Sequence, residues 1–178
     1  MRVIELIEEV NEALNKNLNV YSNSSDIPQI ENQLKTKLRR YVKNIEELQS
    51  ELFNQARLRR TRKITIDYRA YVACAIGATY KGIGTFGSSH GMLNNYGSFI
   101  LLLNRLKHLG NVGHRSSKYF KGGKNFIGKC AEIKASYALH KKNRITNLKS
   151  IEFTKAYRPR TMQVIERCDN CKYVFGNV

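Results

Sequence analysis

The chain has 178 residues, enough for one ordinary domain with a helical extension. Lysine and arginine contribute 31 residues and the acids 14, which gives a formal net charge of +17 and a pI of about 9.9. A field of this sign favours a polyanionic partner, such as nucleic acid, an anionic membrane surface or an acidic protein. No apolar run approaches the ~20 residues that span a bilayer, and the acidic start argues against a signal peptide.

The first sixty residues differ in pattern from the rest. Apolar residues recur at alternating spacings of three and four along 3–14 and again along 34–52, which predicts two amphipathic helices. Asp26 can cap the second helix. We therefore expect a helical hairpin or coiled-coil extension over 1–60, through which the chain could associate with itself.

Residues 61–178 have the mixture of β-branched, aromatic and helix-forming segments that is typical of an α/β domain. The expected elements, in chain order, are strands at 64–66 and 71–76, a turn with an irregular strand within 77–91, a helix at 98–109 ended by Gly110, a loop at 111–129, a helix at 131–142, a strand at 150–157 and a helix at 168–175. Strands that alternate with helices indicate helices layered over a sheet.

The four cysteines have a spacing that favours metal over disulfides. Cys168 and Cys171 form a Cys-x-x-Cys, and Cys130 lies in Cys-Ala-Glu. A spacing of three places both sulfurs on one side of a helical turn, where both can reach one tetrahedral ion at ~2.3 Å. Cys74 lies in an apolar strand, and we expect it to be a buried core residue rather than a fourth ligand.

Two predicted helix N-termini carry these motifs, and they can converge on one ion. Free backbone N–H groups and the positive end of a helix stabilise thiolates there. The prediction is a Zn²⁺ ion bound by Cys130, Cys168 and Cys171. A structural site would take a fourth protein ligand, whereas a catalytic site leaves that position to water. Glu132 is well placed to touch the water.

The two motifs resemble the signature of the zinc-dependent cytidine-deaminase-like superfamily, which is His- or Cys-x-Glu followed by Pro-Cys-x-x-Cys. The Cys-Ala-Glu form with a late Cys-x-Asn-Cys is most similar to the YwqJ-like branch of bacterial toxin deaminases. The resemblance covers residues 64–178 and is specific only at the two motifs. Arg167 stands where the family has proline, and the family continues beyond the last cysteine into at least one further strand, so we expect a short sheet or one completed by a partner.

The resemblance implies a three-layer α/β/α cytidine-deaminase-like domain over 61–178. It implies a zinc-dependent hydrolase that converts cytosine to uracil in DNA or RNA: hydroxide supplied by zinc attacks the amino-bearing ring carbon, and Glu132 shuttles the proton. It also implies a bacterial toxin module that acts in the cytoplasm after delivery by a dedicated secretion route. A neutralising, acidic immunity-type protein would then be a partner.

Basic and aromatic residues are interleaved around the motifs, a combination that suits single-stranded nucleic acid because charge neutralises phosphates and aromatic faces stack bases. A base in a duplex would first have to be flipped out. The candidate substrate contacts are His90, Asn94, Asn95, Lys129, Arg158, Arg160 and Arg167.

Other functions stay open on the same residues. A non-enzymatic, zinc-stabilised nucleic-acid-binding module would need a fourth protein ligand, and Glu132 would be dispensable in it. A deaminase of adenine or of free nucleosides would carry the same motifs.

Overall fold

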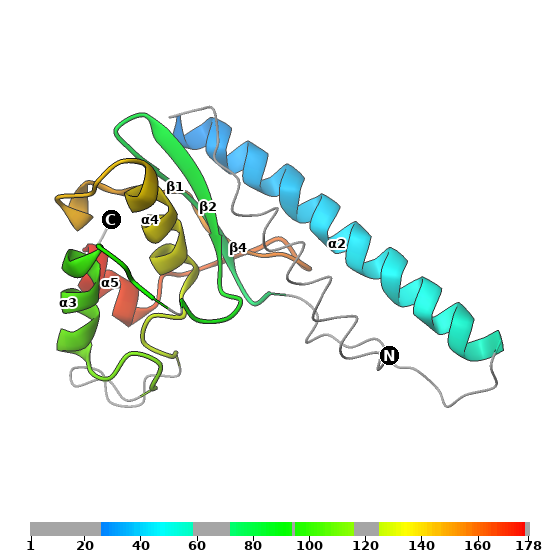
Figure 1. Ribbon diagram of the computed structural model, residues 1–178. Helices are drawn as coiled ribbons and strands as arrows, with labels where there is room; N and C mark the ends of the chain where they lie inside the picture. The colour runs from blue at the N-terminus through cyan, green and yellow to red at the C-terminus, as the bar shows by residue number, and fades with distance from the viewer. Residues whose placement is uncertain (1–25, 59–71, 94, 116–124, 177–178) are drawn as a thin grey trace.

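The structure, a computed structural model, describes residues 26–58, 72–93, 95–115 and 125–176 (Figure 1). These residues form a mixed α/β fold with four α-helices and a five-stranded antiparallel sheet. The elements in chain order are α2 (Ile27–Leu58), β1 (Ala75–Tyr80), β2 (Ile83–Ser88), α3 (Ile100–Leu109), α4 (Ala131–Lys142), the short 3₁₀ helix η2 (Leu148–Ser150), β3 (Glu152–Phe153), β4 (Ala156–Arg158), β5 (Gln163–Ile165) and α5 (Asp169–Phe175). The helix expected along 3–14 and the strand expected at 64–66 lie outside the described residues.

The sheet is built around a β-hairpin. β1 and β2 pair antiparallel from Ala75 with Ser88 to Tyr80 with Ile83. The connecting Lys81 and Gly82 both have positive φ, 47° and 80°, as a tight two-residue hairpin turn requires. β4 follows on the other side of β1 and β5 lies outside β4, while the short β3 also pairs with β1.

Three strand predictions need correction. The strand expected at 71–76 begins at Ala75 instead, because the Cys74 N–H bonds to the side-chain hydroxyl of Ser89 and not to strand backbone. The second strand, expected to be irregular, pairs regularly over six residues. The strand expected at 150–157 is divided into β3 and β4, because Thr154 bonds to Gly77 through both its backbone N–H (3.0 Å) and its hydroxyl (2.9 Å). The predicted helices are confirmed within two residues at each end as α3, α4 and α5.

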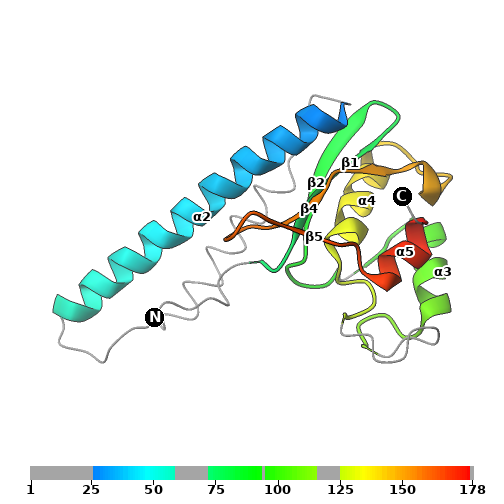
Figure 2. The ribbon, with the colours of Figure 1, turned by 180° about the vertical axis from the view of Figure 1, so that it is seen from behind.

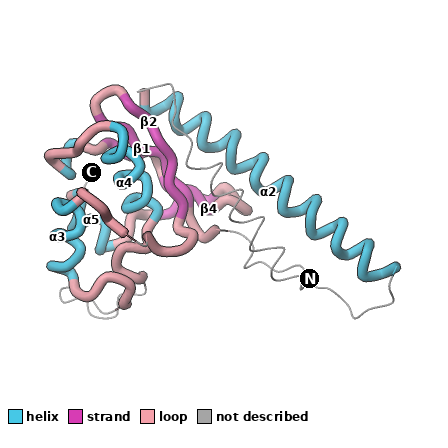
Figure 3. Tube along the Cα trace, in the orientation of Figure 1, coloured by secondary structure: helices cyan, strands magenta, loops and turns pink. Residues whose placement is uncertain are grey.

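Helix α2 covers one face of the sheet, and α4 covers the other (Figures 1 and 2). The apolar stripe of α2 is buried from Ile30 to Ile45 against sheet residues that include Ala75, Phe86 and Tyr157. The stripe from which we expected a hairpin or coiled coil is thus covered by the sheet over this length. The tube in Figure 3 shows that α2 then continues past the end of the sheet.

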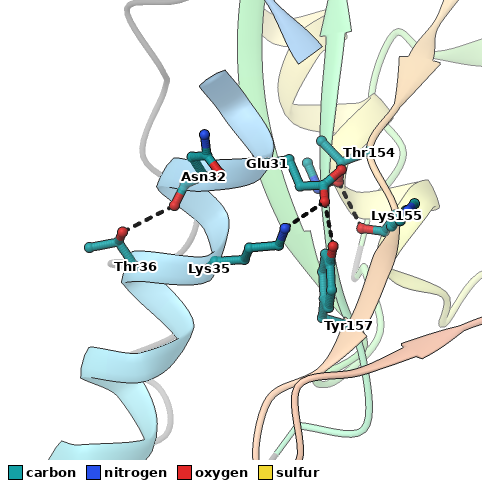
Figure 4. A network of polar contacts seen from close by, with 8 residues as sticks. Glu31, Asn32, Lys35, Thr36, Thr154, Lys155 and Tyr157 are labelled. Carbon is teal, nitrogen blue, oxygen red and sulfur yellow. Dashed lines mark hydrogen bonds and ion pairs between the residues drawn. The ribbon is translucent and has the colours of Figure 1, made fainter. Parts of the chain in front are cut away.

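A polar network fixes α2 to β4 (Figure 4). The Tyr157 hydroxyl donates a hydrogen bond to the Glu31 carboxylate, and the Lys35 ammonium lies 2.8 Å from the same carboxylate. Partial burial works against ionisation of Glu31, but the hydrogen bonds from Lys35 and Tyr157 prevail and lower its pKa. The charged pair therefore holds the middle of the sheet against the first turns of α2.

The opposite face of the sheet packs closely on α4 at Gly87, which has no side chain. A Cβ atom on Gly87 of β2 would collide with the backbone oxygen of Ala131 and lie 2.6 Å from the backbone nitrogen of Ala135. Because Gly87 has none, the first turns of α4 lie directly on the strand. Helices α3 and α5 complete this side, and their apolar residues join one core cluster with those of α4 and β1. No described helix combines the length and the apolar character needed to span a membrane.

We predict that Gly87→Ala destabilises the protein by about 3 kcal/mol, since the new methyl group meets helix backbone that cannot move alone. Gly77→Ala is the matched control in the neighbouring strand. Its methyl group would meet the side-chain methyls of Ile30 and Thr154 at 2.6 and 2.9 Å, which can adjust, so its cost should be about 1 kcal/mol. Denaturant unfolding of the two variants measures the difference, and equal costs would contradict the close packing of α4 on β2.

Candidate metal centre and adjoining cavity

Three thiols meet where the N-termini of α4 and α5 converge. Cys130 is the N-cap residue of α4 and Cys168 that of α5, and both have extended backbone (φ −64°, ψ 152° and φ −71°, ψ 157°). Neither side chain bonds to its own helix as a cap, and the two sulfurs lie 3.4 Å apart. Cys171, fully buried in the first turn of α5, brings a third sulfur, and all three lie within 4.8 Å of one another.

The donor set and its size fit zinc. Thiolates are ligands that zinc favours, and Zn–S bonds of ~2.3 Å in a tetrahedron place sulfurs about 3.8 Å apart. The observed sulfur–sulfur spacing is close to that value, so small side-chain movements would bring all three sulfurs to bonding distance of one ion. Three close cysteines could therefore hold a metal ion, and the arrangement is compatible with zinc.

The three thiols of the cluster differ in pKa. Hydrogen bonds from Cys130 and Cys171 lower the pKa of Cys168 to about 3, while hydrogen bonding within the cluster and burial raise the pKa of Cys130 and Cys171 above the usual range for a thiol. The metal-free cluster thus holds one negative charge near neutral pH. A divalent cation would bind there and displace the two remaining protons.

Glu132 lies beside the thiols in the first turn of α4. Its side chain is buried, with 4 % of the residue exposed. Burial raises the pKa of Glu132, and the negative charge at Cys168 acts in the same direction. A carboxylate with a raised pKa can both accept and return a proton near neutral pH, as general acid–base chemistry requires.

A cavity of about 500 Å³ opens on one side of this cluster. That volume falls in the range of small-molecule sites and accommodates a nucleobase with its sugar. The lining residues come from the ends of β1 and β2, the start of α4, and strands β4 and β5: Val72, Ala73, Cys74, Ser89, His90, Gly91, Asn125, Phe126, Lys129, Cys130, Ala131, Glu132, Ala156, Arg158, Ile165, Glu166 and Cys168.

Three of the residues predicted to contact substrate line the cavity: His90, Lys129 and Arg158. Arg160 lies in the turn between β4 and β5, and it is not among the described lining residues.

The other predicted contacts have local partners or no description. The Arg167 guanidinium donates a hydrogen bond to the Gly176 carbonyl at 3.2 Å and lies over the Phe153 ring. The Asn95 side chain accepts a hydrogen bond from the backbone of Gly97 at 2.7 Å, as in an Asx turn. Asn94 lies outside the described residues.

The structure adds two residues that the sequence did not single out for this site. Cys74 packs beside the core but also lines the cavity, and burial, with the charges of Glu132 and Cys168 nearby, raises its pKa to about 12. The alternation of side chains along a strand could have indicated this position. Cys74 and Ile76 are two residues apart and so point to the same face of the sheet, and Ile76 faces α4. Lys134 of α4 donates a hydrogen bond to the His90 carbonyl, and burial lowers its pKa to about 8.

Comparisons with protein-family models, with curated proteins and with solved structures found no match to this chain.

We predict that zinc binding at pH 7 releases about two protons, because only Cys168 is ionised beforehand. The affinity should then rise about 100-fold per pH unit near neutrality. Calorimetric titration in buffers of different ionisation enthalpy measures the proton count. Release of fewer than two protons would contradict the shared-proton description of the cluster, and any release above two would come from the zinc-bound water.

Proposed function

We propose that this chain is a zinc-dependent nucleobase deaminase that converts cytosine to uracil in DNA or RNA. The observation that carries the proposal is the position of Glu132: a buried carboxylate beside a three-thiol cluster, on the wall of a base-sized cavity. A structural zinc site needs neither the carboxylate nor the cavity.

A zinc ion held by the three thiolates would supply part of the hydrolytic chemistry. When bound, zinc acts as a Lewis acid and lowers the pKa of a water molecule to near neutrality. Three thiolates would hold the ion, and their net negative charge makes it a weaker Lewis acid than a site with a neutral histidine. The reaction therefore depends strongly on the protein's own base.

Glu132 would be that base. Its raised pKa lets the carboxylate take a proton from the attacking water and deliver it to the ring nitrogen of the base. The carboxylate would then take the proton of the hydroxyl group now on the ring carbon and pass it to the amine, so that ammonia departs and the carbonyl of uracil forms. Burial keeps bulk water from competing for these transfers.

The cavity lining supports a substrate that carries phosphate. Lys129 and Arg158 supply positive charge at the cavity, and the Lys129 ammonium lies 5.3 Å from the ring centre of Phe126, which also lines it. Helices on both faces of the sheet are also compatible with the three-layer α/β/α arrangement of the cytidine-deaminase-like superfamily. The toxin role, the delivery route and the acidic immunity-type partner rest on the resemblance of the two motifs alone.

A non-enzymatic zinc module is the second candidate function, and the position of the Cys74 thiol favours it. This thiol lines the same cavity as Cys130 and Cys168, although the described three-sulfur cluster does not include it. If Cys74 swung onto the ion, the site would have four protein ligands and no position for water.

Glu132→Gln should lower the rate of deamination by about 10³-fold or more while zinc stays bound, because the amide cannot transfer protons. Glu166→Gln is the matched control, since Glu166 also lines the cavity but is exposed, whereas Glu132 is buried. Rates and zinc content are measured on the same preparations. Retention of most turnover in zinc-loaded Glu132→Gln would rule the mechanism out.

The substrate is identified by incubating zinc-loaded protein with single-stranded DNA and RNA and sequencing the products. We expect C-to-T changes that are absent with Glu132→Ala. A-to-G changes would assign adenine instead, and an unchanged sequence in both polymers, with no ammonia from free nucleosides, would sink the deaminase proposal.

A further inference from the structure

We propose that Tyr96 is a positioning residue of the metal centre, whose buried hydroxyl donates a hydrogen bond to the Cys130 thiolate in the zinc-bound chain. This role rests on the zinc centre of the proposed function and is independent of which base is converted. The hydroxyl would orient a ligand of the ion without touching substrate, since Tyr96 is not among the described residues that line the cavity.

The Tyr96 hydroxyl is buried without a hydrogen-bond partner. Only 7 % of the residue is exposed, and the hydroxyl oxygen is one of two buried side-chain polar atoms that have no partner within the described part of the chain. Nearly all buried polar groups in folded proteins are hydrogen-bonded, because a buried group without a partner has lost its hydration and gained nothing in return. Such a hydroxyl is suited to an acceptor that forms when the neighbouring site binds its ligand.

The hydroxyl lies against the segment that leads into Cys130. Gly128 precedes Cys130 by two residues and has a φ of 87°, and a Cβ atom on it would collide with the Tyr96 hydroxyl. The same Cβ atom would lie 3.0 Å from Val112 and 3.3 Å from Met92. The atoms that these two side chains present are methyl carbons, which accept no hydrogen bond, so an acceptor has to come from elsewhere.

The Cys130 sulfur is the group that can serve as this acceptor. Tyr96 belongs to the apolar cluster against which Cys130 packs. Burial raises the pKa of Tyr96 to about 12, and negative charge on Cys130 acts in the same direction, so the hydroxyl keeps its proton near neutral pH and can donate it. A cysteine bound to zinc is a thiolate, and a charged acceptor forms the stronger hydrogen bond.

The turn that carries Tyr96 holds the side chain in this position. The Tyr96 carbonyl accepts a hydrogen bond from the Phe99 N–H at 3.0 Å, and the Asn95 side chain accepts one from the Gly97 N–H at 2.7 Å. Phe99, the N-cap residue of α3, is fully buried. Because the turn is anchored in the core, the hydroxyl can restrain the Cys130 side chain, as hydrogen bonds to metal ligands do in other zinc sites.

The test is the zinc affinity of the full chain with and without Tyr96→Phe, measured by competition with a chromophoric chelator. The substitution removes only the hydroxyl. We expect the affinity to fall about 10-fold, since the loss of a hydrogen bond to a metal ligand weakens metal binding by this factor or more. The zinc-free variant should resist denaturant as well as the wild type or better, because the hydroxyl has no partner among the described residues.

Tyr80→Phe is the matched control, since Tyr80 is also buried but lies at the opposite end of β1 from Cys74, with its hydroxyl 3.5 Å from that of Thr146. We expect it to keep the wild-type zinc affinity. With Co²⁺ in place of zinc, Tyr96→Phe alone should shift the thiolate-to-cobalt charge-transfer band to lower energy, because the sulfur loses a hydrogen bond. A purely structural role of the hydroxyl would not move this band.

Equal zinc affinity in Tyr96→Phe and the wild type would overturn the role of Tyr96, as would an equal loss in both tyrosine variants or an unshifted cobalt band. A wild-type chain that binds no zinc would overturn both this role and the zinc-dependent function. Zinc binding without base conversion would count against the deaminase proposal alone.

Discussion

The convergence of two helix N-termini is the constraint on which the site depends. Cys130 and Cys168 occupy equivalent N-cap positions with nearly the same backbone angles, and their sulfurs face each other instead of capping their own helices. Free N–H groups and helix dipoles at both ends favour negative charge on sulfur. The position of α4 is in turn fixed by Gly87, because only a residue without a side chain lets the helix backbone lie on the strand. A change remote from the thiols can therefore alter their spacing.

The far side of the sheet contributes to the same geometry. Helix α2 buries its stripe on β1 and β2 and binds β4 through Tyr157 and Glu31. The residues on either side of Tyr157, Ala156 and Arg158, line the cavity. A helix that the sequence assigned to a hairpin or coiled-coil extension thus helps to hold the cavity wall in place.

The helices and the clustering of three cysteines were predictable here to a degree that the strands were not. The starts of α4 and α5 follow from motifs whose chemistry needs a helix terminus, so both were predicted within one residue. Glycines at 77, 84 and 87 leave β1 and β2 without the period-two pattern that identifies a strand, and β5 has three mostly exposed residues. The place of Cys74 in the cavity depends on Ser89, whose hydroxyl accepts a hydrogen bond from the Cys74 N–H at 3.0 Å, a tertiary contact that spacing does not encode.

The central claim is an open metal site next to Glu132, and X-ray absorption at the zinc edge of the zinc-loaded chain tests it most directly. We predict three sulfurs at about 2.3 Å and one oxygen at about 2.0 Å. Cys74→Ala should leave this spectrum unchanged, because Cys74 lines the cavity without belonging to the cluster. A spectrum with four sulfurs that loses one in Cys74→Ala would contradict the account, since a closed site leaves no place for the reacting water.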